Sequence, residues 1–272
     1  MKFTARIPVT AAMLALLLGS VTGCNRLKAR DQLVKGIAAF KNAHYEEAVD
    51  HFQNSIDLDP NYQQARLYLA TAYAYQVVPS LDTPENKQIA QKAIDGFQKV
   101  LDKDPNDVTA LQQIASIDFN IMKYDEAKDY EKKVIALDPN RSEAYYTIGV
   151  VNWKIAYKNA TTLLAADKLT DDGIGNVKMS KATCQKITDA NKDVVAEGLQ
   201  YLHKAIDVNP NYDAAMEYLQ LTYRRQADLA CGDRNALKES LTQAQNWVDK
   251  AMGVRKEKER EKEKKNQGGV QM

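Results

Sequence analysis

The sequence predicts an all-α protein built from about five repeated helix-turn-helix units. Three observations lead to this prediction. The 272 residues include only 12 glycines and 7 prolines, too few for a loop-rich β protein. A short turn phrase recurs four times along the chain. Apolar residues three and four positions apart, the spacing of an amphipathic helix, precede and follow each phrase.

The chain begins with the pattern of an export signal. Lys2 and Arg6 precede an apolar run over residues 7–18, and small residues follow that run. A helix that crosses a bilayer needs about 20 apolar residues, so this run is too short to span one.

The phrase Val21-Thr22-Gly23-Cys24 resembles the lipobox of bacterial lipoproteins. The resemblance implies that residues 1–23 are a cleaved signal peptide and that Cys24 becomes a lipidated first residue, with a diacylglyceryl group and an acyl chain such as palmitate. Two or more chains anchor a protein stably, at about 0.8 kcal/mol per buried methylene. It also implies a periplasm-facing place in the envelope, and Asn25, where an aspartate favours inner-membrane retention, favours the outer membrane. The alternative is a plain signal peptide with an incidental cysteine.

The recurring phrase contains a Pro-Asn pair. Proline lacks the N–H that a helix needs and disfavours helical geometry in the residue before it, so we expect a helix to end just before each copy. The copies are DLDPNY, DKDPND, ALDPNR and DVNPNY, with the prolines Pro60, Pro105, Pro139 and Pro210.

The spacing of these phrases resembles the tetratricopeptide repeat. Pro105 and Pro139 are 34 positions apart, which is the period of that family. The resemblance implies a superhelical solenoid over residues 29–254, in which each repeat has a helix A and a helix B and buries its apolar face on its neighbours. Small residues stand where the family brings helices close together: Gly36, Ala70, Ala115 and Gly149 on helix A, and Ala48, Ala93, Ala127 and Gly198 on helix B.

Two repeats are longer than this period. The distances from Pro60 to Pro105 and from Pro139 to Pro210 are 45 and 71 residues. We expect the extra residues in the A–B connections of repeats 2 and 4, near residues 76–88 and 157–189. These connections share one edge of a solenoid, and such insertions often mark a binding face.

The predicted solenoid is flanked by two short segments. Residues 24–28 form a tether between the lipidated cysteine and the first repeat. Residues 255–272 form a charged tail that contains the run RKEKEREKEKK. Opposite charges three apart and like charges four apart roughly offset one another there. We expect an exposed helical extension or a disordered tail, with contact to lipid headgroups or to a partner as the alternative.

The two other cysteines lie in the A–B connections of adjacent repeats. Cys184 belongs to repeat 4 and Cys231 to repeat 5. An exported protein meets an oxidising compartment in which thiols pair. Our hypothesis is a Cys184–Cys231 disulfide that holds the long insertion to the stack, and the alternative is two unpaired cysteines.

The sequence contains no catalytic or cofactor motif that we can identify. It lacks HExxH, GxSxG, P-loop and CxxC patterns. His44 and His51, with acidic residues between them, are better explained as surface residues than as a metal site. We therefore predict a protein that is not an enzyme and has neither metal nor cofactor. The balance of 37 basic and 36 acidic residues does not favour nucleic-acid binding.

The resemblance implies that the protein binds a partner. In the family, helix-A residues line a concave groove that holds a peptide or a helix, and aromatic residues and arginine often dominate such interfaces. Some of these positions, above all Tyr68 and Tyr146, could instead be packing residues between helices. The groove positions here are Tyr68, Tyr75, Gln112, Gln113, Phe119, Asn120, Tyr146, Trp153, Lys154, Tyr218, Arg224 and Arg225.

We therefore expect a membrane-anchored scaffold or adaptor that binds another protein or peptide of the cell envelope, in the assembly of an envelope complex. One alternative is a structural envelope protein that binds glycan or lipid. The other is an enzyme with its site in the insertion at residues 157–189.

Overall fold

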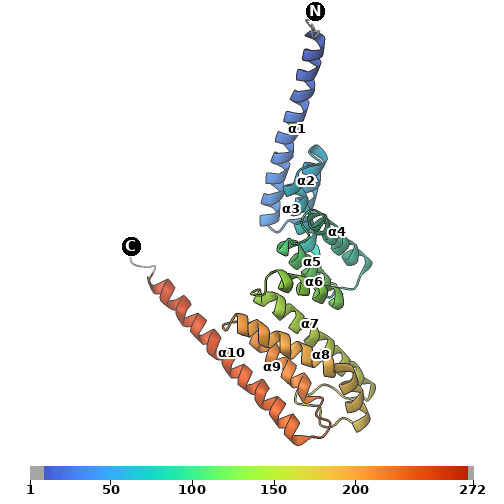
Figure 1. Ribbon diagram of the computed structural model, residues 1–272, viewed down its shortest axis with the longest axis vertical. Coiled ribbons are helices and arrows are strands. Elements are labelled where there is room, and N and C mark those ends of the chain that lie inside the picture. Colours follow the sequence, from blue (N-terminus) through green and yellow to red (C-terminus); the bar gives the residue numbers. More distant parts are fainter. Residues whose placement is uncertain (1–8, 269–272) are drawn as a thin grey trace, which may run out of the picture. The chain divides into compact units, whose positions relative to one another are not determined.

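The computed structural model describes the backbone of residues 9–268 and the side chains of residues 24–265. This part of the chain is all-helical and contains no strand, which confirms the predicted fold class (Figure 1). Its ten helices are α1 (Val9–Lys41), α2 (Tyr45–Leu58), α3 (Gln63–Gln76), α4 (Pro84–Leu101), α5 (Val108–Asn120), α6 (Tyr124–Leu137), α7 (Ser142–Ala166), α8 (Lys181–Val208), α9 (Asp213–Ala227) and α10 (Arg234–Gly268).

The predicted signal peptide, residues 1–23, lies outside the residues whose side chains are described. Cys24 is exposed on α1 and is the one free cysteine of the described part. No helix in the described range is both long enough and apolar enough to cross a membrane.

The helices form two compact units, residues 1–123 and 124–272. In the first unit, each of the helices α1 to α5 packs on the next, and α1 also contacts α3. The second unit repeats this pattern with α6 to α10, where α7 also contacts α9. Each unit is therefore a stack of helix pairs in which a helix A touches the following helix A, as in the predicted tetratricopeptide solenoid.

The Pro-Asn phrases end helices as predicted, and all four use the same turn. Helices α2, α6 and α8 end two residues before Pro60, Pro139 and Pro210. In every copy, the side-chain oxygen of the residue before proline accepts the N–H of the asparagine after it, an Asx turn. These pairs are Asp59 with Asn61, Asp104 with Asn106, Asp138 with Asn140, and Asn209 with Asn211, at 3.1 to 3.2 Å.

The small residues stand where helices approach closely. A Cβ added to Gly149 on α7 would lie 2.4 Å from Leu202 Cγ on α8. One added to Gly36 on α1 would lie 2.5 Å from the ring of Phe52 on α2. The alanines at the other predicted positions are at most 1% exposed, namely Ala48, Ala70, Ala93, Ala115 and Ala127.

The first insertion lies in the A–B connection of repeat 2, and it also lengthens helix B. Residues 77–83 connect α3 to α4, and Thr83 caps the 18-residue α4. Asn86, which is 3% exposed, holds the connection: its side chain accepts from the Val78 N–H at 2.8 Å and donates to the carbonyls of Val78 and Leu81 at 3.0 and 2.8 Å.

The structure of the second insertion differs in part from the prediction, which placed its extra residues in the A–B connection near residues 157–189. Most of residues 157–189 is helical, because α7 continues to Ala166 and α8 begins at Lys181. Only residues 167–180 form a loop. The extended helix ends bury apolar residues against each other, with Ala160, Leu164 and Ile187 at 0 to 1% exposure. Because their apolar faces cover one another, the extra residues prolong the helix pair.

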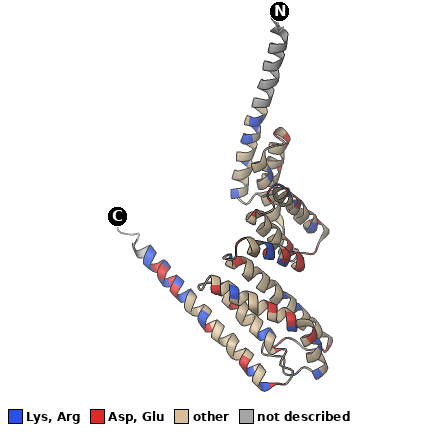
Figure 2. Cartoon of the chain, in the orientation of Figure 1, with Lys and Arg blue, Asp and Glu red and all other residues tan. Residues whose placement is uncertain are grey.

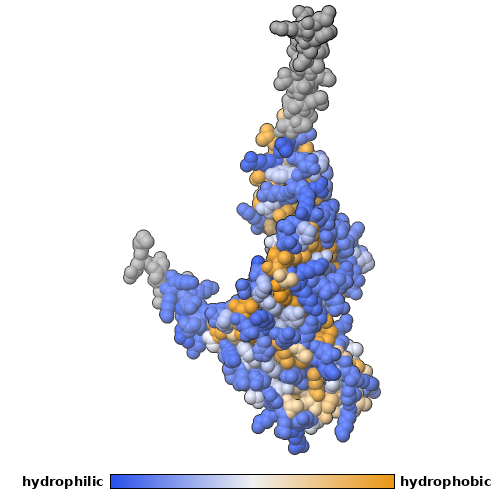
Figure 3. All heavy atoms as spheres, viewed as in Figure 1, coloured by the Kyte–Doolittle hydropathy of each residue, from blue (hydrophilic) through white to orange (hydrophobic). Residues whose placement is uncertain are grey.

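The charged tail is helical as far as Gly268, so of the two forms expected for it this part takes the helical extension and not the disordered tail. Its first turns are held to α9: Arg255 donates to Asp213 at 3.0 Å and pairs with Glu217, and Lys258 donates to Asp213 at 2.5 Å. Beyond these contacts, lysine and glutamate alternate on an exposed, hydrophilic surface (Figures 2 and 3).

Candidate functional site

The predicted groove residues divide equally between the two units. The first unit contains Tyr68, Tyr75, Gln112, Gln113, Phe119 and Asn120, and the second contains Tyr146, Trp153, Lys154, Tyr218, Arg224 and Arg225. Each group is described within its own unit.

In the first unit, the two tyrosines have different environments. The ring of Tyr68 stacks on the buried Phe52 at 5.4 Å, so Tyr68 is a packing residue of the α1–α3 core. Tyr75 remains 59% exposed and contacts the rings of Phe40 and Tyr45 at 5.0 and 5.5 Å. The four other predicted residues lie half-buried on α5.

In the second unit, the predicted aromatic residues come together. Tyr146 and Trp153 on α7 both contact Tyr218 on α9 edge-on, with ring centroids 5.7 and 5.2 Å apart. Tyr212 meets Tyr146 at 5.0 Å, and Tyr157 stacks on Trp153 at 5.4 Å. These five residues form a continuous set of rings, here called the aromatic row.

The rings of the aromatic row are partly exposed, and the phenol groups of Tyr146 and Tyr212 are uncharged. Tyr157 is 42% exposed, and the four other rings are half-buried. Burial raises the pKa of Tyr146 to about 12, and the neighbouring Tyr218 and Glu217 add to this effect. Burial also raises the pKa of Tyr212. The phenols of Tyr146 and Tyr212 therefore keep their protons at neutral pH and can donate hydrogen bonds to a bound chain.

The two arginines predicted for the groove serve another purpose. Arg225 is 3% exposed and lies between Asp171 and Asp228, with N–O distances of 3.0 Å to each. Its assignment as an accessible groove residue is therefore wrong, because the two carboxylates draw its guanidinium into the interior. Arg224 is half-buried and donates to the Gly173 carbonyl at 2.9 Å. Both arginines hold the 167–180 loop to α9.

Asn176 completes this buried polar cluster. Its side chain donates to Asp171 at 2.9 Å and to Asp228 at 2.8 Å. Burial raises the pKa of Asp228 to about 7, although Arg225 opposes the shift. Burial also disfavours the charged form of Asp171, but hydrogen bonds from Asn176 and Arg225 outweigh it and hold the pKa of this carboxyl below its usual range. Asp171 therefore carries the larger share of the negative charge beside Arg225.

The structure joins Cys184 and Cys231 in a disulfide, the pair named from the sequence. Their Cα atoms are 5.5 Å apart, and 47 positions separate them in the chain. Cys184 is buried on α8, whereas Cys231 is exposed in the turn between α9 and α10. The bond holds the A–B connections of repeats 4 and 5 together.

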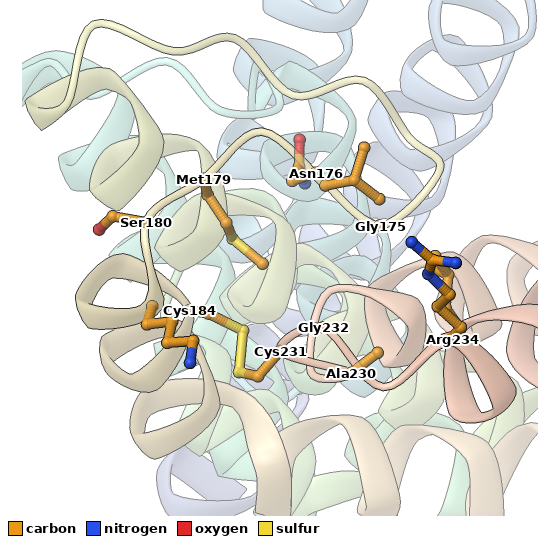
Figure 4. Close-up of a pocket in the computed structure, with 12 residues that line it drawn as sticks. Gly175, Asn176, Met179, Ser180, Cys184, Ala230, Cys231, Gly232 and Arg234 are labelled. Carbon is orange, nitrogen blue, oxygen red and sulfur yellow. A yellow bond between two sulfur atoms is a disulfide. The ribbon is translucent and has the colours of Figure 1, made fainter.

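A pocket of about 360 Å³ opens beside this disulfide (Figure 4). Met179 extends towards the disulfide, and Arg234 lies across the pocket from Ser180. Val177 and Leu237 add further apolar surface, and Lys181 adds a second cation. The described residues contain no group of three histidine, cysteine, aspartate or glutamate side chains placed to hold a metal ion.

Several residues of these sites were not identified from the sequence. Tyr157 and Tyr212 lie outside the predicted helix-A register, one in the extension of α7 and the other in a turn phrase. The polar cluster was missed because its members are far apart in the chain: 52 positions separate Asn176 from Asp228. The available signal was an acidic, glycine-containing loop, DDGIGN, followed two helices later by the arginine pair of α9.

No protein-family model and no curated protein matches this chain. Solved structures of MamA are similar to it. MamA 41-end from Desulfovibrio magneticus RS-1 is 17% identical, with a TM-score of 0.55 over 85% of this chain and 96% of that chain. Two other MamA crystal structures, 16% and 17% identical, give TM-scores of 0.54 and 0.53 over 86% and 83% of this chain, and 94% and 96% of theirs. At these identities the likeness shows a shared fold, the stack of tetratricopeptide-type helix pairs.

Proposed function

We propose that this protein is a lipid-anchored tetratricopeptide scaffold of the bacterial cell envelope that binds another protein or peptide through the aromatic row. The observation that carries the proposal is the contact of Tyr218 with both Tyr146 and Trp153, which gathers accessible rings from two A helices. Aromatic side chains supply large contact area, and rings already held in place lose little freedom on binding.

The bound segment contains apolar or aromatic side chains. The row offers ring faces and edges, and Lys154, the residue after Trp153, is half-buried. An extended strand or one face of a helix fits such a surface, with phenol groups available for backbone carbonyls.

The envelope location rests on the N-terminal sequence and on the disulfide. The export pattern and the phrase before Cys24 favour lipidation at that residue, with the outer membrane favoured over the inner by Asn25. A disulfide that closes a long loop is typical of proteins that work in an oxidising compartment.

The chain offers a matched pair of variants for the binding test. Its two tryptophans are both half-buried, with Trp153 in the aromatic row and Trp247 on α10 against His203. The tagged protein and its variants would be used to recover partners from detergent-solubilised envelope. We expect Trp153→Ala to weaken recovery of the partner at least tenfold, as is typical of a hot-spot tryptophan, and Trp247→Ala to retain it. Equal recovery by both variants would exclude the aromatic row as the binding surface.

The anchor is tested separately. Mass spectrometry of the purified protein should show a chain that begins at a diacylated or triacylated Cys24. Cys24→Ala protein should leave the membrane fraction while still binding the partner. An unmodified Cys24 in membrane-bound protein would exclude the lipid anchor and leave the binding proposal intact.

A further inference from the structure

The pocket beside the disulfide combines apolar walls with unpaired positive charge. Val177, Met179 and Leu237 provide the apolar surface, and Lys181 and Arg234 provide the charge. Val177 is 65% exposed, so its side chain is accessible to a bound ligand. Neither cation forms an ion pair within the described residues, and both are exposed.

This surface continues along α10. A second, shallower depression shares Arg234 and Leu237 with the pocket and adds Lys238 and Leu241. The combined surface therefore carries three cations beside a line of apolar side chains. No acidic residue lines either depression among the described residues.

Carboxylates close in sequence or in contact with the lining residue Asn176 are engaged elsewhere. Asp233 accepts the N–H groups of Asn235 and Ala236, so its side chain caps α10. Asp171 and Asp228 face the buried guanidinium of Arg225. The positive charge of the pocket is therefore left for an external anion.

The N-terminus of α8 strengthens this preference, whereas the Asp233 carboxylate already occupies that of α10. Both α8 and α10 begin at the pocket, with Lys181 and Arg234 as their first residues. The positive end of a helix dipole and its unpaired N–H groups attract anions. On α8 the side chain of Ser180 accepts from Thr183, and the Ser180 carbonyl accepts from Cys184. The N–H groups of Lys181 and Ala182 have no partner within the helix.

We propose that this surface, here called the disulfide pocket, is a second docking site that takes an aliphatic side chain flanked by carboxylates in an extended segment of a partner protein. Charge complementarity selects this occupant: the aliphatic side chain fills the apolar pocket while aspartate or glutamate residues on either side meet Lys181, Arg234 and Lys238. The site shares no residue with the aromatic row and goes beyond the proposed function.

The test uses the full-length chain and a defined probe. The probe is a fluorescein-labelled peptide with one leucine between pairs of glutamates, and its binding is followed by fluorescence anisotropy. Two control peptides replace the glutamates by glutamine or the leucine by alanine. We expect saturable binding of the probe, at least tenfold weaker binding of either control peptide, and an affinity that falls as salt is added, because exposed charges are screened.

Variants of the protein assign the binding to the pocket. The double variant Lys181→Glu, Arg234→Glu should bind the probe at least tenfold more weakly, because two charges that attract the glutamates are replaced by charges that repel them. Val177→Ser should lower the affinity for the probe by a smaller factor, because only one exposed apolar side chain is lost. Lys204→Glu is the matched control: it reverses one exposed charge of the same helix, about 34 Å from Lys181 at 1.5 Å per residue, and should bind normally.

Three results would overturn the proposal: no saturable binding of the probe up to about 1 mM, a weak limit for specific recognition; equal binding of the glutamine peptide; or normal binding by the Lys181→Glu, Arg234→Glu variant. Trp153→Ala should bind the probe like the unaltered chain, and a loss there would place the peptide on the aromatic row instead. Failure of the disulfide pocket is thereby distinguished from failure of the proposed function.

Discussion

Arg225 and Asp228 form an ion pair that is almost completely shielded from water. Their side chains are 3% and 0% exposed, and Nη1 of the arginine lies 3.0 Å from Oδ2 of the aspartate. The pair joins the end of α9 to the loop of the preceding repeat, because the same guanidinium also meets Asp171. A residue type that often marks a binding surface is here part of the interior.

Replacing Arg225 by methionine should destabilise the second unit strongly. The change leaves the carboxylates of Asp171 and Asp228 without their cation, and breaking a buried pair in this way costs about 3–5 kcal/mol. Urea denaturation followed by circular dichroism measures the free energy of unfolding. Arg224→Met is the control, because it removes only the half-buried hydrogen bonds to Gly173 and Gln220, each worth about 1 kcal/mol. Equal losses in the two variants would contradict a special role for Arg225.

The buried Glu131 should make stability fall as pH rises. Burial raises the pKa of this carboxyl to about 7, with the nearby Glu143 adding to the shift and a hydrogen bond from Thr147 opposing it. Because this value lies above that of the unfolded chain, 4.5, the folded state retains a proton that the unfolded state has lost between these pH values. The contribution is complete below about pH 4.5 and is lost as pH rises through 7.

Glu131→Gln isolates that effect. Glutamine cannot ionise, so the variant should lose the part of the pH dependence that Glu131 causes and become about 1–3 kcal/mol more stable than the parent chain at pH 8. Melting curves at pH 5 and pH 8 provide the measurement. The same pH dependence in both proteins would show that Glu131 titrates normally.

Gly149→Ala should disturb the packing of α7 on α8. The new Cβ would lie 2.4 Å from Leu202 Cγ, and overpacking of this kind costs about 1–3 kcal/mol. Gly253→Ala on α10 is the matched control, because an added Cβ there meets no atom within 4 Å. That change should be neutral or stabilise the helix by up to about 1 kcal/mol. Thermal unfolding of the two variants should therefore shift in opposite directions, and a loss in both would argue against the close approach.

Removing the disulfide should lower stability without unfolding the helices. A loop of 47 positions corresponds to about 4 kcal/mol in the chain-entropy model, and measured losses are usually about 2–4 kcal/mol. The variant Cys184→Ala, Cys231→Ala should be unaffected by a reducing agent, and the reduced parent chain should match it in urea denaturation. Cys24→Ala protein should lose as much stability on reduction as the parent chain does, since Cys24 is not part of the disulfide.

The helical order of the chain could be predicted because its signals are local. A proline, an Asx turn and an apolar period of three and four residues act within one or two turns of helix, so Pro60 and Pro139 mark helix ends in sequence and structure alike. The positions of the insertions could be predicted from the sequence, but their secondary structure could not. Whether residues 157–166 continue a helix depends on Leu164 meeting Ile187, which is a contact between distant segments.

The aromatic row was recognised only in part for the same reason. Register on helix A identified Tyr146, Trp153 and Tyr218, which lie on one side of two neighbouring helices. Tyr157 lies one helical period after Trp153 on α7, but it fell in the segment expected to be an insertion, and Tyr212 joins Tyr146 from a turn phrase outside the helix.

The sequence by itself determined that the chain is a series of helix pairs, where each pair turns, and which small residues permit close approach. These features follow from backbone geometry and nearest neighbours. Only the tertiary structure decided which long side chains remain accessible. Arg225 and Trp153 are equally suited to an interface by type, but Asp171 from a distant loop and Asp228 from the next turn enclose the arginine, while the indole, packed between Tyr157 and Tyr218, stays half-buried. Burial of a charge depends on partners brought together by folding, and that information is not local.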